Sequence, residues 1–250
     1  MTSRKLEVHA TRQSMIGAVC DRTVDAMERA MLESGWCMWV LSGGSTPRAI
    51  LERLADEPYR SRIVWNRLHL FWGDERTVPP DRSDSNYRMV YDALIRHVAI
   101  PEANIHRIEG ERDPENAADA YAKEIARLFE DDPPRFDLIW LGMGDDGHTA
   151  SLFPGTGATE VIDRHVTAVY VPKLETWRVT LTLPVLNAAC EVHVLVSGAD
   201  KAEMMRRVVE CGDPTEELPI TMVRPSDGTM YWFVDETAAE KLKRRSFVES

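Results

Sequence analysis

Residues 136–155, FDLIWLGMGDDGHTASLFPG, constrain the fold of this chain more than any other stretch. They open with an apolar run of the kind found in strands buried on both faces of a parallel sheet, although a buried helix would give the same run. Gly142 and Gly144 follow at once and favour the strand. Two acids and a histidine come next: Asp145, Asp146 and His148. Open α/β sheets place their ligand crevice at the carboxyl ends of their strands. The stretch therefore predicts a strand that ends in functional side chains.

Asp146 and His148 have the spacing of a general base and its carboxylate partner. A carboxylate two residues from an imidazole can fix the tautomer of the ring and raise its basicity. The alternative is a polar turn in which Asp146 and Thr149 are caps and His148 is merely solvated, because short motif matches carry a real false-positive risk. The choice between these interpretations depends on how often the rest of the chain repeats the pattern.

Three further apolar runs end in polar loops in the same way. Residues 36–41 lead into SGGSTP, residues 68–72 into GDER, and residues 191–196 into SGADK. The first loop has the composition of a phosphate site, because its glycines let the backbone approach an anion, its hydroxyls donate, and the N–H groups of the helix predicted to follow face the same way. It matches neither a Walker sequence nor a dinucleotide fingerprint. A turn capped by Ser45 or Thr46 is the alternative.

The remaining chain supplies the other helices and strands of an α/β sheet. Apolar periodicity and flanking signals predict helices at residues 11–34, 48–55, 86–98, 115–129, 202–209 and 235–245. Ser83 or Ser85 is expected to cap the third of these helices. Further strands are predicted at residues 166–171, 178–184 and 229–234. The helices between the strands provide the crossovers that parallel strands need.

Length and composition bound the class of protein. Residues 1–250 are interpreted as one domain, because no composition shift, repeat or long linker divides them. The net charge of -11 argues against a nucleic acid or an anionic membrane as the main partner, but leaves an anionic small molecule open. No signal peptide or membrane-spanning run is found, so we expect a soluble cytoplasmic protein. The cysteines form no CxxC pair and are expected to be reduced: Cys20, Cys37, Cys190 and Cys211.

Several blocks of the sequence together resemble the 6-phosphogluconolactonases, the lactonases of the pentose phosphate pathway. The blocks are SGGSTP, FWGDERTVP with SDSNYRM, LGMGDDGHTASLFP, RVTLTLPVLNAA and SGADKAEM, in this order over residues 41–201. The resemblance implies a Rossmann-like open, mostly parallel sheet with helices on both faces, shared with the glucosamine-6-phosphate deaminases and the ribose-5-phosphate isomerases. It also implies hydrolysis of 6-phospho-D-glucono-1,5-lactone to 6-phospho-D-gluconate without a cofactor.

The resemblance assigns roles to the polar residues at the strand ends. His148 would be the base that activates water, and Asp146 would orient it. Asp74 and Arg76 would line the sugar and carbonyl end of the pocket, with Arg76 and backbone N–H groups of the glycine loop as candidate oxyanion donors. Asp145 receives no essential role. The phosphate would be held by six residues: Gly43, Gly44, Ser45, Thr46, Lys201 and Arg178.

The sequence supports neither a covalent nucleophile nor a metal. No serine lies in a GxSxG elbow and no cysteine lies beside a histidine. The acids and the histidine at the strand ends match no recognised ligand spacing, so no metal is predicted: Asp74, Glu75, Asp146 and His148. The oligomeric state is left as a monomer or a small homo-oligomer.

Two other classes of function remain open. The first is a sugar-phosphate deaminase or isomerase on the same fold. Against it, this chain has Phe153 where the deaminase pattern has a glutamate, and Arg76 where that pattern has a tyrosine. The second is a non-catalytic sugar-phosphate sensor, which would carry a helix-turn-helix segment at one end. No such segment is apparent in the first or last forty residues.

Overall fold

The computed structural model describes residues 3–129, 133–210, 214–244 and 246–247. Its centre is a seven-stranded sheet with the strand order β1-β10-β9-β6-β2-β3-β5, in which every pair of neighbours runs parallel. The strands are β1 Ser3–His9, β2 Cys37–Leu41, β3 Leu68–Trp72, β5 Ile105–His106, β6 Leu138–Leu141, β9 Glu191–Val196 and β10 Thr229–Asp235. The predicted Rossmann-like parallel sheet is confirmed.

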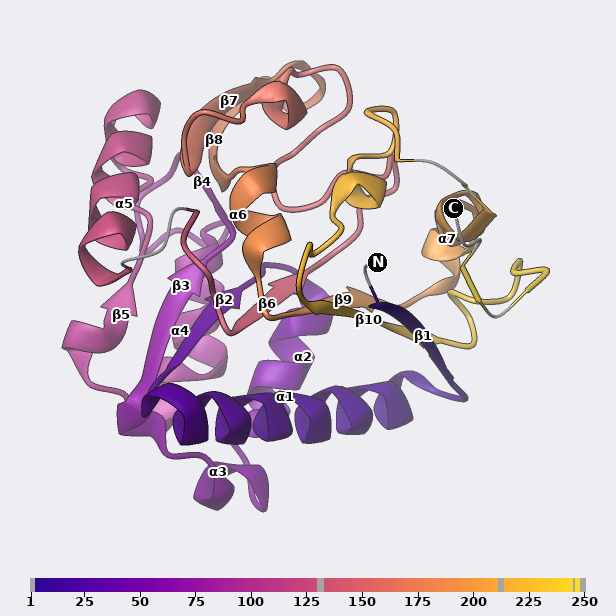
Figure 1. Ribbon diagram of the computed structural model, residues 1–250, viewed down its shortest axis with the longest axis horizontal. Helices are drawn as coiled ribbons and strands as arrows, with labels where there is room; N and C mark the ends of the chain where they lie inside the picture. The colour runs from indigo at the N-terminus through magenta and orange to yellow at the C-terminus, as the bar shows by residue number, and fades with distance from the viewer. Residues whose placement is uncertain (1–2, 130–132, 211–213, 245, 248–250) are drawn as a thin grey trace.

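Helices cover both faces of this sheet (Figure 1). In that view α1 runs along the lower side of the sheet, while α6 stands on the upper side. The helices are α1 Arg12–Ser34, α2 Ser45–Leu54, α3 Tyr59–Arg62, α4 Asn86–Ala93, α5 Pro114–Leu128, α6 Leu183–Ala188 and α7 Ala202–Glu210. Within the described residues, none of them combines the length and the apolarity that crossing a membrane would require.

The ends of α1 follow from its local sequence. Thr11 is the N-cap, and its hydroxyl accepts the backbone N–H of Ser14 while the Ser14 hydroxyl accepts the N–H of Thr11. This reciprocal arrangement satisfies two donors that the first turn of a helix leaves unpaired. At the other end Gly35 has a φ of 86°, a left-handed conformation that a side chain would strain. The helix predicted at residues 11–34 is confirmed.

A second, antiparallel sheet lies above the parallel one in Figure 1. It contains β4 Asp74–Arg76, β8 Thr176–Leu181 and β7 Val166–Val171, in the order β4-β8-β7. Only Gly73 separates β3 from β4, and its carbonyl accepts the N–H of Leu181 at 2.9 Å. The chain therefore passes from the central sheet into the second sheet within one residue. The sequence predicted β7 and most of β8, but the strand predicted at residues 178–184 ends at Leu181, because α6 begins at Leu183. The separate pairing of these strands was not predicted.

Several parts of the chain differ from the sequence predictions, among them the following three. The helix predicted at residues 235–245 is wrong: the chain turns at 236–241, and Asp235 accepts the N–H of Ala238 while also bonding the loop after β9. Residue 245 lies outside the described residues.

The helix predicted at residues 86–98 ends at Ala93 and is followed by a 3-10 turn, because Leu94 leaves the helical region with a φ of -135°. Strand β1 was not predicted, since its charged, partly exposed sequence has no apolar run.

The cysteines are consistent with the prediction of reduced thiols as far as the structure describes them. Cys20 and Cys37 are buried and Cys190 is partly buried, and all three are free. Burial raises the pKa of Cys20 to about 12, so this thiol is unreactive at neutral pH. Cys211 lies outside the described residues.

Candidate active site

Four strand-end loops meet at one edge of the parallel sheet. β9, β6, β2 and β3 are consecutive neighbours, and because they run parallel their carboxyl ends share that edge. Between the loops lies a cleft of about 240 Å³. Its lining comes from all four loops and from the start of α4: Ser42, Gly43, Gly44, Asp74, Arg76, Asn86, Gly142, Met143, Gly144, His148, Thr149, Ala150 and Lys201. The cleft forms where the repeated strand-and-loop pattern predicts it.

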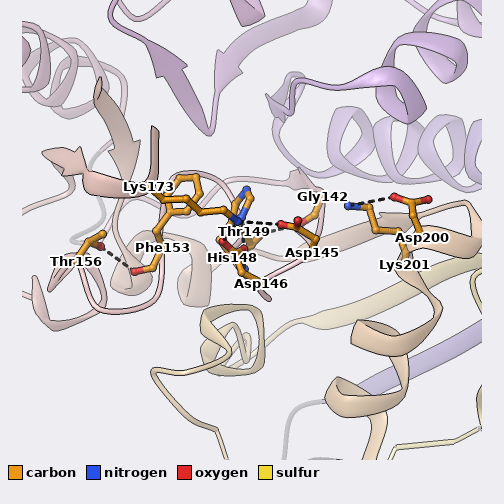
Figure 2. Close-up of polar contacts among 10 residues, drawn as sticks. All are labelled: Gly142, Asp145, Asp146, His148, Thr149, Phe153, Thr156, Lys173, Asp200 and Lys201. Carbon is orange, nitrogen blue, oxygen red and sulfur yellow. Dashed lines mark hydrogen bonds and ion pairs between the residues drawn. The ribbon is translucent and has the colours of Figure 1, made fainter. Parts of the chain in front are cut away.

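His148 and Asp146 form a hydrogen-bonded pair at the edge of this cleft (Figure 2). The Nδ1 atom of His148 lies 2.5 Å from Oδ1 of Asp146, and the same oxygen accepts the backbone N–H of His148 at 3.2 Å. The carboxylate thus fixes both the ring and its backbone. Gly144 leaves space for the ring, since a Cβ there would lie 2.0 Å from Nδ1. Because Nδ1 is engaged, Nε2 is the nitrogen left to act on a ligand.

The other side of the imidazole is covered by an aromatic ring. Phe153, which is 7% exposed, stacks on His148 with ring centroids 4.0 Å apart. Phe153 lies on the same loop, five positions further along the chain. The ring of His148 is therefore held both by a hydrogen bond at its edge and by a packing contact on its face.

Asp146 is held in its charged form. Burial alone would raise its pKa, but the hydrogen bonds from His148 and Lys173 outweigh burial and lower the pKa to about 2. Lys173 belongs to the 3-10 turn Pro172–Leu174 between β7 and β8, and its Nζ lies 3.0 Å from Oδ2 of Asp146. The two residues are 27 positions apart, so no local sequence pattern signals this contact.

A cluster of possible metal ligands coincides with this pair. Asp145, Asp146 and His148 place their ligand atoms within 4.8 Å of one another. The ammonium group of Lys173 bonds both carboxylates, at 3.3 Å and 3.0 Å. Lys173 therefore offsets one of the two negative charges of these carboxylates.

Asp74 is a buried carboxylate at the start of β4 that faces the same cleft. Its Oδ2 accepts the hydroxyl of Ser151 at 2.6 Å, and its Oδ1 accepts the side-chain amide of Asn86 at 3.3 Å. Since Ser151 lies on the loop of His148, the first bond ties that loop to β4. Neither Asn86 nor Ser151 was predicted from the sequence to belong to the site. One sequence feature could have indicated Asn86: it begins a helix that follows a polar strand-end loop, and helix N-termini at such loops often bind ligands.

Glu75 has a structural role next to the cleft. Its carboxylate accepts the backbone N–H groups of Asn86 at 2.7 Å and Tyr87 at 2.8 Å, and the hydroxyl of Ser85 at 3.0 Å. Burial raises its pKa even though these hydrogen bonds oppose the rise. A carboxylate at a helix N-terminus stabilises the helix, so Glu75 positions α4 rather than binding a ligand. The cap of α4 itself is Ser85, one of the two predicted serines.

Arg76 and Arg178 lie directly opposite each other across β4 and β8. Arg76 lines the cleft, and its Nη1 donates to the carbonyl of Asp84 at 2.9 Å. Within the described part of the chain, the buried Nε atoms of both arginines have no hydrogen-bonding partner. Burial lowers the pKa of Arg178, and the charge of Arg76 adds to this effect. Two adjacent guanidinium groups with unmet donors are suited to bind an anion.

The start of α2 offers backbone donors to the same cleft. Gly44 is the N-cap, has a φ of 108° and provides no side-chain cap, so the first N–H groups of α2 remain available to a ligand. Gly43 packs closely against Asn86, where a Cβ would lie 2.0 Å from the amide oxygen. A larger residue at Gly43 would therefore displace a side chain that lines the cleft.

Lys201 enters the cleft from the loop after β9. It ends the 3-10 turn Ala199–Lys201, and its side chain is 24% exposed. The buried carboxylate of Asp235 holds this loop by accepting the hydroxyl of Ser197 and the N–H of Gly198. Asp235 ends β10, the neighbour of β9, so the position of Lys201 depends on the pairing of these two strands.

The structure brings most of the predicted site residues together. The cleft lining contains Gly43, Gly44, Asp74, Arg76, His148 and Lys201. Asp146 contacts His148, and Arg178 lies opposite Arg76. Ser45 and Thr46 are the first residues of α2 and do not line the cleft, although their N–H groups belong to the turn that faces it. The Ser45 side chain is exposed, and its carbonyl accepts a hydrogen bond from Arg12.

These features define a class of protein: Rossmann-like α/β enzymes in which a histidine–aspartate pair shares a strand-end cleft with groups that bind anions. Residues 10–232 match the family described as glucosamine-6-phosphate isomerases/6-phosphogluconolactonase, and the chain belongs to this family.

Proteins named 6-phosphogluconolactonase are similar to this chain both in sequence and in structure. The 6-phosphogluconolactonase of Synechocystis sp. is 38% identical over 243 residues, which cover 96% of this chain and 98% of that protein. The crystal structure of 6-phosphogluconolactonase from Thermotoga maritima is 31% identical, covers 94% of this chain and 100% of that chain, and has a TM-score of 0.78. The solved structure of 6-phosphogluconolactonase from Trypanosoma brucei is 30% identical, covers 97% of this chain and 99% of that chain, and has a TM-score of 0.82.

Proposed function

We propose that this protein hydrolyses 6-phospho-D-glucono-1,5-lactone to 6-phospho-D-gluconate, the lactonase step of the oxidative pentose phosphate pathway. The relatives described above carry the name of this activity. The observation that carries the proposal is the pairing of His148 with Asp146 beside a cleft that also contains Arg76 and Lys201. A base and two cations in one cleft suit a phosphorylated ester whose hydrolysis develops negative charge.

His148 acts as the general base through Nε2 in this proposal. It takes a proton from water as the water oxygen attacks C1 of the lactone, and the carbonyl becomes a tetrahedral oxyanion. The C1–O bond to the ring oxygen then breaks, and His148 returns the proton to that oxygen. Asp146 keeps Nδ1 protonated and stabilises the imidazolium that forms between the two proton transfers. Water is thereby added across the ester, with no covalent intermediate and no cofactor.

Arg76 is the proposed side-chain donor to the oxyanion, and backbone N–H groups after β6 are the other donors. The N–H of Gly144 is engaged with the carbonyl of His148 at 2.9 Å. Gly142 and Met143, which both line the cleft, are therefore the backbone donors we propose. The buried carboxylate of Asp74 is placed to accept a sugar hydroxyl.

The phosphate group is proposed to bind at the start of α2 with help from two cations. Lys201 supplies a charge inside the cleft, and the N–H groups of the first turn of α2 supply directed donors. Arg178 adds positive charge from its position opposite Arg76. The full set comprises Gly43, Gly44, Ser45, Thr46, Lys201 and Arg178.

A deaminase or isomerase acting on a sugar phosphate is the rival function, because the family description includes an isomerase. Phe153 stands where the deaminase pattern has a glutamate, and it stacks on His148. A phenyl ring cannot accept a hydrogen bond from the imidazole, so it cannot hold the histidine as a shuttle for ring opening. This contact favours the lactonase.

One paired assay tests the proposal against its rivals. Decay of freshly made 6-phosphogluconolactone is followed with purified protein, corrected for spontaneous hydrolysis, with His148→Asn as the matched control. We expect the unaltered protein to accelerate decay and the variant to lose most of this effect, with no ammonia from glucosamine 6-phosphate. Ammonia release without lactone hydrolysis would identify a deaminase. Calorimetric binding of a sugar phosphate without turnover of either substrate would identify a sensor.

We also propose that the enzyme works in the cytoplasm as a monomer or small homo-oligomer. The free thiols of Cys20 and Cys37 support the compartment, since thiols stay reduced in the cytosol. The net charge of -11 supports a small-molecule partner over a nucleic acid or an anionic membrane.

A further inference from the structure

Lys173 is a charged residue next to the active site that the proposed mechanism does not use. It lies on the turn between β7 and β8, whereas His148 lies on the loop that follows β6, a strand of the other sheet. Its Nζ lies 3.0 Å from Oδ2 of Asp146 and 3.3 Å from Oδ1 of Asp145 (Figure 2). Asp146 therefore divides its two oxygens between two donors, with Oδ1 bonded to His148 and Oδ2 bonded to Lys173.

Lys173 is placed to act on Asp146 rather than on a substrate. It is absent from the lining of the cleft, whereas His148 is part of that lining. The backbone of Lys173 is held in place by the two strands that flank its turn, because β7 and β8 pair without interruption from Val166↔Leu181 to Val171↔Thr176. The bonds to Asp146 and Asp145 raise the pKa of Lys173, so the ammonium group stays charged through the neutral range.

We propose that Lys173 is a positioning residue that limits how strongly Asp146 favours the protonated form of His148. Its positive charge bonds the same carboxylate that would stabilise an imidazolium, and it opposes a second positive charge nearby. Without the charge of Lys173, Asp146 would stabilise the imidazolium more strongly at the expense of the neutral imidazole, which is the form that accepts a proton from water. This inference rests on the proposed role of His148 as the base.

The charged groups around His148 come from several elements. Asp145 and Asp146 lie on its own loop, Lys173 lies on the β7–β8 turn, and the cleft adds Asp74, Arg76 and Lys201. Besides His148, Lys173 is the one donor side chain that bonds the carboxylate of Asp146 within the described residues. Replacing Lys173 therefore changes the charge felt by the pair without altering the lining of the cleft. Since the Lys173 side chain is 56% exposed, solvent screening keeps the effect moderate.

Two substitutions at Lys173 test the inference. Lys173→Met removes the charge and keeps an unbranched side chain, while Lys173→Arg keeps the charge. Lys123→Met, at an exposed lysine of α5, is the matched control for loss of one positive charge elsewhere. For each protein, kcat for lactone hydrolysis is measured across the acid limb of the pH profile, and the imidazole of His148 is titrated by NMR without substrate.

We expect both readouts of Lys173→Met to move upward by about 0.5 pH unit, with KM unchanged. Lys173→Arg and Lys123→Met should superimpose on the unaltered protein. A uniform loss of activity in Lys173→Met with an unmoved acid limb and an unmoved NMR midpoint would leave Lys173 only a structural role. A raised KM with an unmoved midpoint would make it a substrate contact. Either result overturns the inference.

The variant His148→Asn separates this inference from the proposed function. If His148→Asn is inactive and the Lys173→Met midpoint does not move, the inference about Lys173 fails and the base assignment stands. If His148→Asn keeps near-normal activity, the base assignment fails, and the inference fails with it.

Discussion

The imidazole of His148 stacks on the phenyl ring of Phe153, with centroids 4.0 Å apart and ring planes inclined by 23°. The carboxylate of Asp146 bonds the edge of the same imidazole at Nδ1. Two contacts of different physical kinds therefore determine where Nε2 points. Phe153 also stands at the position where the deaminase pattern has a glutamate. The same residue therefore affects the orientation of His148 and distinguishes this chain from the deaminase pattern.

Replacing Phe153 by leucine tests the contribution of stacking to orientation. Phe153→Leu keeps an apolar side chain in a buried position and removes the ring. A stacked pair contributes about 0.5–1.5 kcal/mol, so kcat should fall about 2- to 10-fold while KM changes little. Phe129→Leu, at an aromatic contact of Phe71 and Phe136 away from the cleft, is the control. Equal kcat values for Phe153→Leu and the unaltered protein would show that Asp146 alone orients His148.

Replacing His148 by asparagine should reduce kcat by roughly 10² to 10⁴, the usual contribution of general base catalysis. The fold should be retained, since the His148 side chain is 26% exposed and lies on a loop outside the helices and strands. Urea unfolding checks the second point and steady-state kinetics the first. Asp146→Asn should be less harmful, because the amide oxygen can still accept the Nδ1 hydrogen. A larger loss than in His148→Asn would instead show that Asp146 chiefly holds the loop through the His148 N–H.

Replacing Lys201 by alanine should raise KM more than it lowers kcat, because phosphate contacts are made in both the ground state and the transition state. A hydrogen bond to a charged group contributes about 1.5–3 kcal/mol, which corresponds to roughly a 10- to 100-fold rise in KM. Lys243→Ala, at an exposed lysine near the end of the chain, is the matched control. An unchanged KM in Lys201→Ala would remove Lys201 from the phosphate site.

The stability of the protein should fall as the pH drops below about 6.5. Burial is the main cause that lowers the pKa of His69, His106 and His193. Because these pKa values are lower in the folded state than in the unfolded state, the unfolded chain takes up protons first as the pH falls. The contribution of these histidines to the free energy of unfolding is then constant above about pH 6.5 and decreases below it until the folded pKa values are reached.

Urea unfolding at a series of pH values measures this slope. His69→Gln should lose part of it, because His69 is one of the groups that protonate on unfolding and its Nδ1 lies 2.9 Å from Nε2 of His106. A slope in His69→Gln that matches the unaltered protein would exclude His69 as a contributor. Most carboxylates titrate below this range, so they contribute little to the comparison.

The four loops that carry the site could be predicted from local sequence patterns. Each apolar run ending in glycine and polar residues is a local signal, because burial on both faces of a sheet demands the run and the turn demands the glycine. Parallel strands then bring their carboxyl ends to one edge, which places Arg76, His148 and Lys201 near one another without knowledge of the strand order. The pairing of Asp146 with His148 was equally local, since two positions separate them.

The residues that complete the site from distant parts of the chain could be identified only from the folded structure. Ser151 bonds Asp74 across 77 positions, and Lys173 bonds Asp146 across 27. Arg178 faces Arg76 only because β4 leaves the central sheet and pairs antiparallel with β8. Edge strand β1 and the turns at 236–241 also depended on tertiary partners, β10 for the first and the loop after β9 for the second. These contacts have no period and no fixed spacing in the sequence, because they arise only when the packing of separate elements sets their distance.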